Sequence, residues 1–296
     1  MFDPAQLAAL AAVHRRGSFD LAAADLGLTQ SAVSQRIRAL EERVGVLLVR
    51  RGSPSVATTA GLRLIRHHDE VALLAKEVSE ELGAAAPGAA TLRIAVNADS
   101  LATWILPALA KVPDVLFDLV IDDQEVSEDW LRRGEVVAAV TSNPSPLQGC
   151  DTVPLGALRY HATASPDYVT RWFPDGVTAQ AIAKAPALVF SDKDRLQMAW
   201  VERQGLRSRE MFPSHRLASA QGFVDACLVG LGWGMNPELL IREHLSSGQL
   251  VALIADTPLD VPLYWQFARV TAGAVSALTQ AMRAAAGDAL VPIAAS

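Results

Sequence analysis

The sequence contains few of the residues from which disulfide frameworks and metal centres are built. Two of its 296 residues are cysteines, Cys150 and Cys227, and neither has a second cysteine or a histidine at metal-ligand spacing. Apart from the adjacent pair His67 and His68, the six histidines show no such spacing either. The sequence therefore predicts buried or incidental thiols, no metal site and no cofactor.

Long apolar runs and catalytic motifs are also missing. No apolar stretch approaches the ~18 residues that span a bilayer, and residues 1–4 lack the basic start of a secretory signal peptide. These absences favour a cytoplasmic protein that does not associate with a membrane. A P-loop, a GxGxxG turn after a strand, an HExxH helix and a GxSxG elbow are absent too. The sequence therefore predicts that the chain is not an enzyme.

What is present is a pattern of two short helices joined by a tight turn, between Ser18 and Arg51. Ser18 is placed to cap the first helix, Gly27 to end it, and Thr29 to cap the second. Each helix carries an apolar stripe at three- and four-residue spacing. The pattern predicts a helix-turn-helix, which commonly places its second helix in the major groove of DNA. The stripes are Phe19, Ala22, Ala23 and Leu26 in the first helix, and Val33, Ile37, Leu40 and Val44 in the second.

The outward face of the second helix offers amide, hydroxyl and guanidinium groups, which are the groups that read base edges. Arginines nearby suit phosphates or a narrow minor groove. A generic three-helix bundle would also show capped helices with a solvated polar face, but the short turn, the small residues and the arginines together favour DNA binding. The predicted DNA-binding residues are Thr29, Gln30, Ser31, Ser34, Gln35, Arg36, Arg38, Arg50 and Arg51.

Charge is distributed in agreement with that prediction. The chain is 51% hydrophobic and has a net charge of −6. Residues 1–58 hold seven Lys/Arg and five Asp/Glu, whereas residues 59–296 hold 19 and 27. Positive charge therefore gathers where DNA is expected, and its modest excess favours dimeric, site-specific binding over a bulk nucleic-acid binder.

Residues 1–62 resemble the winged helix-turn-helix domain of LysR-type transcriptional regulators. The likeness rests on Ser18–Phe19, Gln30–Ser34, Leu40–Glu41, Arg51 and Thr58–Gly61. The resemblance implies double-stranded promoter DNA, RNA polymerase and a small-molecule effector as partners, in a homodimer or homotetramer. It also implies backbone or minor-groove contact from the arginine in the wing. Base contacts are implied for Gln30, Ser31, Ser34 and Gln35.

The residues from Thr58 to about Ala86 predict one long helix, which would span about 40 Å. An apolar stripe follows it at the three-four spacing of a coiled-coil seam. Because a lone helix of this length must bury its stripe against another copy, the pattern favours dimerisation. The stretch Gly83–Ala90, with Pro87–Gly88 inside it, predicts a small-residue hinge. The seam residues are Leu64, His68, Val71, Ala75, Val78 and Leu82; for His68, an ordinary solvated or core histidine is favoured over a pH-sensitive interface residue.

Beyond the hinge, strands alternate with helices, as in a doubly wound α/β domain. The resemblance implies a two-lobed, periplasmic-binding-protein-like effector domain, whose chain crosses between lobes near 160–165 and 264–268. The predicted strands are 92–96, 117–121, 136–140, 188–190, 215–217 and 233–235, and the predicted helices are 101–111, 127–133, 196–204 and 221–230. The predicted domains are 1–58 (winged helix-turn-helix), 59–87 (linker helix and hinge) and 88–296 (effector domain, with lobe I about 88–160 and 269–296, and lobe II about 161–268).

Loops after the strands predict the effector site, because open α/β sheets bind ligands beyond the carboxyl ends of their strands. Ser100, at a helix start, combines a hydroxyl with free N–H groups suited to a carboxylate; the alternative is that it or Asp99 only caps that helix. The predicted effector-binding residues are Asn97, Asp99, Ser100, Trp104, Asp122, Asp123, Thr141, Ser142, Asn143, Phe190, Asp192, Gln221 and Gly222.

These loops are rich in carboxylates, so the cleft attracts cations. Together with the carboxylate-binding helix start, this predicts lysine or arginine as effector, although random surface acidity explains each single aspartate equally well. Independently, Val96–Trp104 resembles the matching stretch of LysR-type regulators of arginine and lysine export, which implies control of an amino-acid exporter gene and related metabolism. A different effector, or a solute-sensing module with weak DNA function, is the alternative. The carboxylates are Asp99, Asp122, Asp123, Glu125, Asp192 and Asp194.

Overall fold

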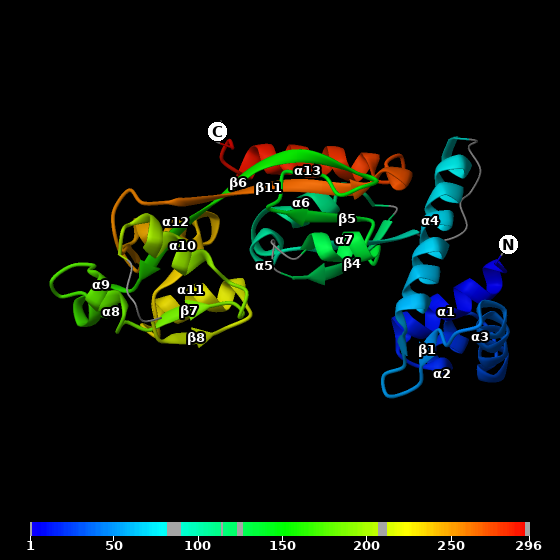
Figure 1. Ribbon diagram of the computed structural model, residues 1–296. Helices are drawn as coiled ribbons and strands as arrows, with labels where there is room; N and C mark the ends of the chain where they lie inside the picture. Colours follow the sequence, from blue (N-terminus) through cyan, green and yellow to red (C-terminus); the bar gives the residue numbers. More distant parts are fainter. Residues whose placement is uncertain (1, 82–89, 114, 123–126, 207–211, 294–296) are drawn as a thin grey trace.

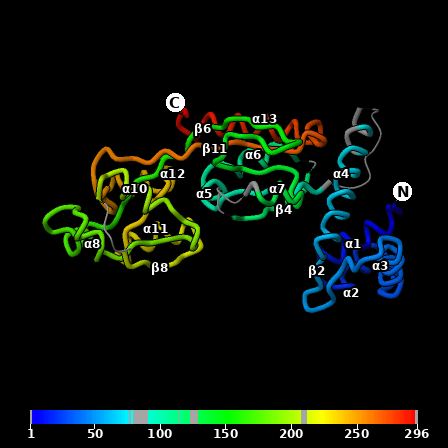
Figure 2. Tube along the Cα trace, viewed as in Figure 1, coloured from blue at the N-terminus to red at the C-terminus, as the bar shows by residue number. Residues whose placement is uncertain are grey.

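A computed structural model describes residues 2–81, 90–113, 115–122, 127–206 and 212–293. A small helical domain at the N-terminus is followed by the long helix α4 (Thr59–Glu81) and then by two α/β lobes. In Figure 1, α4 stands between the helical domain and the first lobe, and two long strands join the lobes. The Cα trace in Figure 2 shows the same order along the chain, with the C-terminal helix lying back on the first lobe.

Side-chain caps set the ends of the N-terminal helices. Ser18 and Thr29 accept hydrogen bonds from the backbone N–H groups of Leu21 and Ala32, which confirms both predicted caps. The apolar stripes of these helices pack into one core with the wing. The elements are α1 (Pro4–Arg16), α2 (Phe19–Asp25), α3 (Gln30–Val44), β1 (Val49–Arg50) and β2 (Val56–Ala57).

Helix α4 begins at Thr59, because the Thr58 hydroxyl accepts from the Gly61 N–H and caps it. Its first turns pack against the N-terminal core, and Leu64 is part of that contact. Leu64, a predicted seam residue, is thus partly buried within the chain, and its place in a seam between copies stays a prediction. Leu82 and most of the predicted hinge, residues 83–89, lie outside the described residues.

Lobe I is built on three parallel strands, in the order β5-β3-β4. The helical segment 98–109 follows β3 and contains one turn of π-helix, Leu101–Ile105. Helix α13 packs on this segment and on β6. The elements of lobe I are β3 (Ala90–Val96), α5 (Ala98–Ser100), α6 (Leu106–Leu109), β4 (Val115–Ile121), α7 (Ser127–Arg133), β5 (Ala138–Thr141) and α13 (Ser276–Ala289), with the short η2 (Arg269–Thr271) before the last helix.

Two long antiparallel strands, β6 (Cys150–Ala164) and β11 (Leu259–Ala268), connect the lobes (Figure 1). Residues 264–267 of β11 pair with β5 in lobe I, and residues 160–163 of β6 pair with β9 in lobe II. Both crossings therefore lie between these paired segments. The predicted crossings at 160–165 and 264–268 are therefore wrong in position, because most of these residues already pair with strands of lobe II and lobe I, respectively. The sequence does not show where a long strand changes its pairing partner.

Within its described residues, lobe II packs five helices and four short strands against the ends of β6 and β11. Strands β7 and β8 are parallel, whereas β9 and β10 pair antiparallel with β6. The core is continuous through both lobes and includes four fully buried tryptophans, Trp104, Trp200, Trp233 and Trp265. The elements are α8 (Pro166–Trp172), α9 (Ala179–Ile182), β7 (Ala187–Val189), α10 (Leu196–Arg203), β8 (Ser214–Arg216), α11 (Ala220–Leu228), β9 (Gly234–Pro237), α12 (Glu238–Ser246) and β10 (Val251–Ala252).

Most predicted strands and helices are present with ends shifted by a few residues. The largest differences are β6 and β11, of which the sequence predicted only crossing points, and the helices α8, α9 and α12, which were not predicted. The helix after β3 begins at Ala98 rather than Leu101. Among the described residues, no helix is long and apolar enough to cross a membrane.

Candidate functional site

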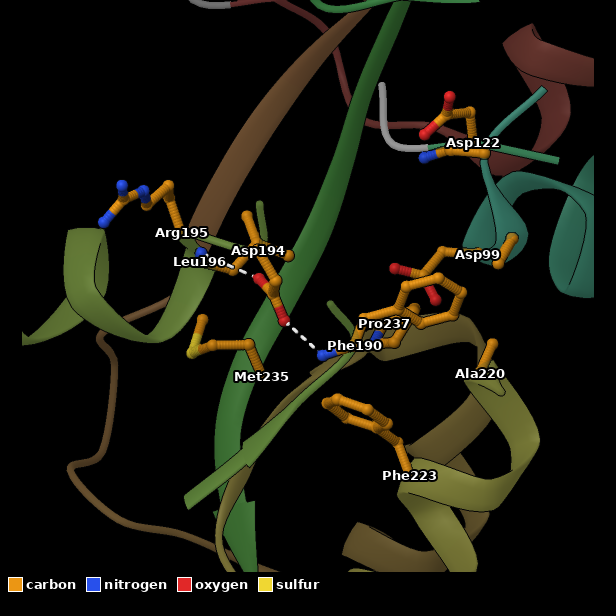
Figure 3. Close-up of a pocket in the computed structure, with 12 residues that line it drawn as sticks. Asp99, Asp122, Phe190, Asp194, Arg195, Leu196, Ala220, Phe223, Met235 and Pro237 are labelled. Carbon is orange, nitrogen blue, oxygen red and sulfur yellow. Dashed lines mark hydrogen bonds between the residues drawn. The ribbon is translucent and has the colours of Figure 1, made fainter. Parts of the chain in front are cut away.

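A pocket opens between the two lobes where strand ends and helix starts meet (Figure 3). Its empty space amounts to about 620 Å³, part of which is open to solvent. Asp99 and Asp122 stand on the lobe I side, whereas the apolar side chains come mainly from lobe II. The lining residues are Asn97, Ala98, Asp99, Asp122, Phe190, Asp194, Arg195, Leu196, Ala220, Phe223, Met235 and Pro237.

Asp99 is held by a residue of the long connecting strand. The Tyr160 hydroxyl donates to Asp99 Oδ2 at 2.8 Å, and Tyr160 is itself fully buried. Asn97 caps the same helix start, because its side chain accepts from the Ser100 N–H at 3.3 Å. The alternative that Asp99 or Ser100 only caps this helix does not hold, because the side-chain cap is Asn97. The Asp99 carboxylate lines the pocket.

Asp122 follows β4 and is fixed from two sides. Trp130 Nε1 donates to its Oδ2 at 2.9 Å. Lys193 Nζ, from the opposite lobe, lies 3.6 Å from its Oδ1. Asp122 therefore presents a carboxylate at the mouth of the pocket, in a position that both lobes reach.

The lobe II side is shaped by a loop that Asp194 folds. Its two carboxylate oxygens accept from the backbone N–H groups of Phe190, at 2.8 Å, and Leu196, at 3.0 Å (Figure 3). Asp194 thus uses its charge to hold the loop and the start of α10. Arg195 lines the same rim, but its guanidinium points away from the two lobe I carboxylates (Figure 3).

Four of the predicted effector residues line this pocket: Asn97, Asp99, Asp122 and Phe190. Asp123 lies outside the described residues. Asp192 is 80% exposed and pairs with Arg216 rather than facing the pocket. The other predicted residues that are described are not among its lining residues; they are Ser100, Trp104, Thr141, Ser142, Asn143, Gln221 and Gly222.

Most of these residues have other roles in the structure. Ser100 and Trp104 are buried on the core side of their helix, and Thr141 accepts from the Asn143 N–H in a tight turn. Gln221 donates to Asp225 on the outer face of α11. The prediction from the sequence did not include most of the lining residues of lobe II, because apolar side chains such as Leu196, Phe223 and Met235 cannot be distinguished from core residues by their chemistry. The one available signal was Asp194, an acidic residue two positions before the start of α10 at Leu196.

A second candidate site is the outward face of α3. Gln30, Ser31, Gln35 and Arg38 are exposed there, and Ser34 is half-buried, while Val33, Ile37 and Leu40 form the buried stripe. The Thr29 hydroxyl accepts the capping hydrogen bond from the Ala32 N–H. The structure thus brings the predicted α3 residues to one solvent-facing surface.

The arginines flank this surface in different ways. Arg36 is half-buried, and Arg50 and Arg51 are exposed on the wing. The Arg51 guanidinium lies 4.8 Å from the centre of the Phe19 ring on α2. This cation–π contact fixes the wing arginine next to the helix-turn-helix.

Neither cysteine belongs to these surfaces. Cys150 and Cys227 are both buried. Burial raises the pKa of the Cys227 thiol to about 12, so it stays protonated at neutral pH. Among the described residues, His, Cys, Asp and Glu form no group of three or more that suits a metal ion.

Comparison with known families accounts for nearly the whole chain. Residues 4–62 match the family described as bacterial regulatory helix-turn-helix protein, lysR family. Residues 85–288 match the LysR substrate binding domain. Both the candidate DNA-binding helix and the pocket thus fall inside matched domains.

Individual relatives match over similar lengths. The chain is 46% identical to the transcriptional regulator LysG of Mycobacterium tuberculosis, over 96% of this chain and 93% of that protein. It is 43% identical to the regulator ArgP of Pseudomonas aeruginosa, over 99% of each.

Solved structures show the same relationship in three dimensions. The crystal structure of ArgP from M. tuberculosis is 44% identical, covers 99% of this chain and 100% of that one, and superposes with a TM-score of 0.80. LysG of Corynebacterium glutamicum with the bound effector Arg is 35% identical, covers 98% and 100%, and has a TM-score of 0.68. The chain therefore belongs to the LysR family of transcriptional regulators.

Proposed function

We propose that this regulator senses a basic amino acid, arginine or lysine, in the pocket between its lobes. The observation that carries the proposal is the pair of carboxylates, Asp99 and Asp122, on one side of that pocket. A basic amino acid brings two cations and one carboxylate, so two acidic side chains and one helix start match its charges.

The geometry supports an orientation for this ligand. The α-carboxylate faces the helix start at Ala98, where backbone N–H groups and the helix dipole favour an anion. The α-ammonium is assigned to Asp99, which lies in the same first turn. The side-chain cation is assigned to Asp122, after the neighbouring strand, and the ligand's methylene groups pack on the apolar wall of lobe II.

A solved relative supports the ligand class. The C. glutamicum LysG structure carries Arg as its bound effector and aligns with 98% of this chain at 35% identity. The carboxylates described above offer the charges that such an effector needs. Control of an amino-acid exporter gene and related metabolism, with RNA polymerase as a partner, completes the proposal.

DNA binding is assigned to α3 and the wing. Gln30, Ser31, Ser34 and Gln35 read base edges in the major groove, because their amides and hydroxyls lie on the outward face. Arg36, Arg38, Arg50 and Arg51 contact phosphates or an adjacent minor groove. Thr29 acts indirectly, through the cap that fixes the start of α3.

A homodimer through α4 follows from the apolar face that this helix exposes. Val71 is 49% exposed, Leu74 38% and Val78 54%, and Ala75 is exposed between them. Burial of this stripe against a second copy stabilises the dimer and places two α3 helices on one promoter, with tetramers built from such dimers. Within each chain, residues 1–58, 59–87 and 88–296 act as the DNA-binding, dimerisation and effector units.

Isothermal titration of the full chain with each of the twenty amino acids tests the effector assignment. Arginine or lysine should bind with micromolar affinity and shift the protein's footprint on its promoter fragment, since an effector acts only through different affinity for two arrangements. Asp122→Asn should weaken arginine binding much more than it weakens any binding of a neutral amino acid. Absence of binding by both basic amino acids would refute the proposal and leave a LysR-family regulator of another effector.

A further inference from the structure

One ion pair joins the two lobes directly at the rim of the pocket. Lys193 belongs to the loop after β7 in lobe II, and Asp122 follows β4 in lobe I. Their charged atoms, Nζ and Oδ1, are 3.6 Å apart. This ammonium therefore lies beside a carboxylate that lines the pocket from the opposite lobe.

The loop that carries Lys193 is held in place by its neighbours. The Lys193 N–H donates to Ser191 Oγ at 3.1 Å, and the Asp194 N–H donates to the Ser191 carbonyl at 3.2 Å. Asp194 in turn binds the backbone at both ends of the loop, at Phe190 and Leu196. The backbone at Lys193 is thus fixed on the rim, and only its flexible side chain has to extend across the cleft.

We propose that Lys193 is an internal competitor of the effector: without effector its ammonium occupies Asp122, and the effector's side-chain cation displaces it. This inference rests on the proposed function, because it names a residue that sets the affinity of that same site. A lysine side chain carries the same ammonium group as free lysine. The chain therefore supplies its own cation to the carboxylate that selects basic ligands. As a result, the protein responds at a higher effector concentration than it would without the Lys193 ammonium.

Exposure sets the size and direction of the effect. The Lys193 side chain is 55% exposed and that of Asp122 is 23% exposed, so the pair is weak and reversible, as a competitor must be. Removing the ammonium should raise the affinity for arginine and lysine about two- to fivefold. Norleucine, which has the lysine chain without its ammonium, should gain nothing.

The first experiment is calorimetric titration of full-length Lys193→Met with arginine, lysine and norleucine. Methionine keeps an unbranched apolar chain of similar length and removes only the charge. Lys184→Met is the matched control, because Lys184 is an exposed lysine of lobe II outside the pocket lining. We expect tighter binding of both basic amino acids in Lys193→Met and wild-type affinities in Lys184→Met.

The second experiment needs no binding measurement. A carbodiimide couples an amine to a carboxylate that touches it, with loss of water, and mass spectrometry locates the new amide. The wild-type chain without amino acid should yield a Lys193–Asp122 link, and added arginine should suppress it. Lys184 serves as the internal control lysine in the same digest.

The two experiments separate the possible failures. No link in the amino-acid-free protein overturns the inference, as does unchanged or weaker binding of arginine and lysine by Lys193→Met, since Lys193 would then be a spectator or a ligand contact. Failure of the wild type to bind either basic amino acid overturns the proposed function, and the competitor role with it. If the wild type binds neither arginine nor lysine but still forms the Lys193–Asp122 link, the ion pair is present and the proposed function is what is wrong.

Discussion

Tyr160 and Asp99 join the connecting strand to the pocket: the buried Tyr160 hydroxyl donates to Asp99 Oδ2 at 2.8 Å. Tyr160 lies on β6 and pairs with both β11 and β9, so it stands where lobe II begins. Asp99 lies at the first helix start of lobe I. This hydrogen bond thereby ties a carboxylate of the pocket to a strand that runs between the two lobes.

Tyr160→Phe removes this hydrogen bond and leaves the ring in the core. A hydrogen bond to a charged group contributes ~1.5–3 kcal/mol to stability. Because this bond is already present without effector, only part of that energy affects binding, and arginine affinity should fall by up to about tenfold as the Asp99 carboxylate loses the donor that positions it. Titration calorimetry measures the change. Tyr168→Phe is the matched control, since its hydroxyl donates to the Pro186 carbonyl of lobe II, away from the pocket; it should lower stability but leave affinity unchanged. Equal losses of affinity in both variants would contradict the assignment of Asp99.

Gln30→Ala should relax sequence preference by ~1–3 kcal/mol, because we propose that this side chain reads base edges. Arg51→Ala should weaken binding evenly across sequences and lower its salt dependence, because a phosphate contact carries no sequence information. Selection from a random DNA library, followed by anisotropy titrations at several salt concentrations, distinguishes the two. An unchanged selected site for Gln30→Ala would count against α3 as the recognition helix.

Ala75→Glu should convert the proposed dimer to monomers, because it places a charge in the exposed apolar stripe of α4. Ala72→Glu adds the same charge at an exposed position about a quarter-turn or more from the stripe centre, and it should remain dimeric. Sedimentation velocity at tens of micromolar protein measures the oligomeric state of both variants. A wild-type monomer, or a dimeric Ala75→Glu variant, would show that copies associate elsewhere.

Acid should loosen the N-terminal domain through His14. Burial, assisted by the positive charge of Arg93, lowers the pKa of this histidine below 6.5. The folded domain therefore holds it neutral, as an acceptor for the Ala57 N–H of the wing. Below pH 6.5 the unfolded chain binds a proton that the folded one does not, so stability is complete above that pH and declines as the pH falls toward the folded pKa.

Amide hydrogen exchange of residues 4–58, corrected for intrinsic rates, measures this decline between pH 7.5 and 5.5. His14→Gln keeps an acceptor without titrating there and should flatten the pH dependence. Burial raises the pKa of Asp69, which lies next to α1. As the pH falls toward its titration range, this carboxyl stabilises the folded domain and so opposes the effect of His14. The difference between variant and wild type isolates the contribution of His14. An identical pH profile in both proteins would exclude His14 as the cause.

The sequence alone was sufficient where local chemistry decides structure. Ser18 and Thr29 cap their helices because their hydroxyls accept bonds only a few residues away, and the stripe of Val33, Ile37 and Leu40 is buried because its spacing matches the helical repeat. The alternation of strands and helices likewise predicted an α/β domain, and the family resemblance implied its two lobes. The strand-end loops predicted that Asp99 and Asp122 belong to the effector site, and both line the pocket.

Tertiary structure decided everything that depends on distant partners. The sequence could not show that β6 and β11 pair along ten positions with sequence separations near one hundred, that Tyr160 reaches Asp99, or that Lys193 crosses to Asp122. It also could not separate Asp194, whose carboxylate folds its own loop, from Asp99, whose carboxylate faces the pocket. Residue type fixes what a side chain can bond, whereas only the packed chain fixes which bonding groups come within reach.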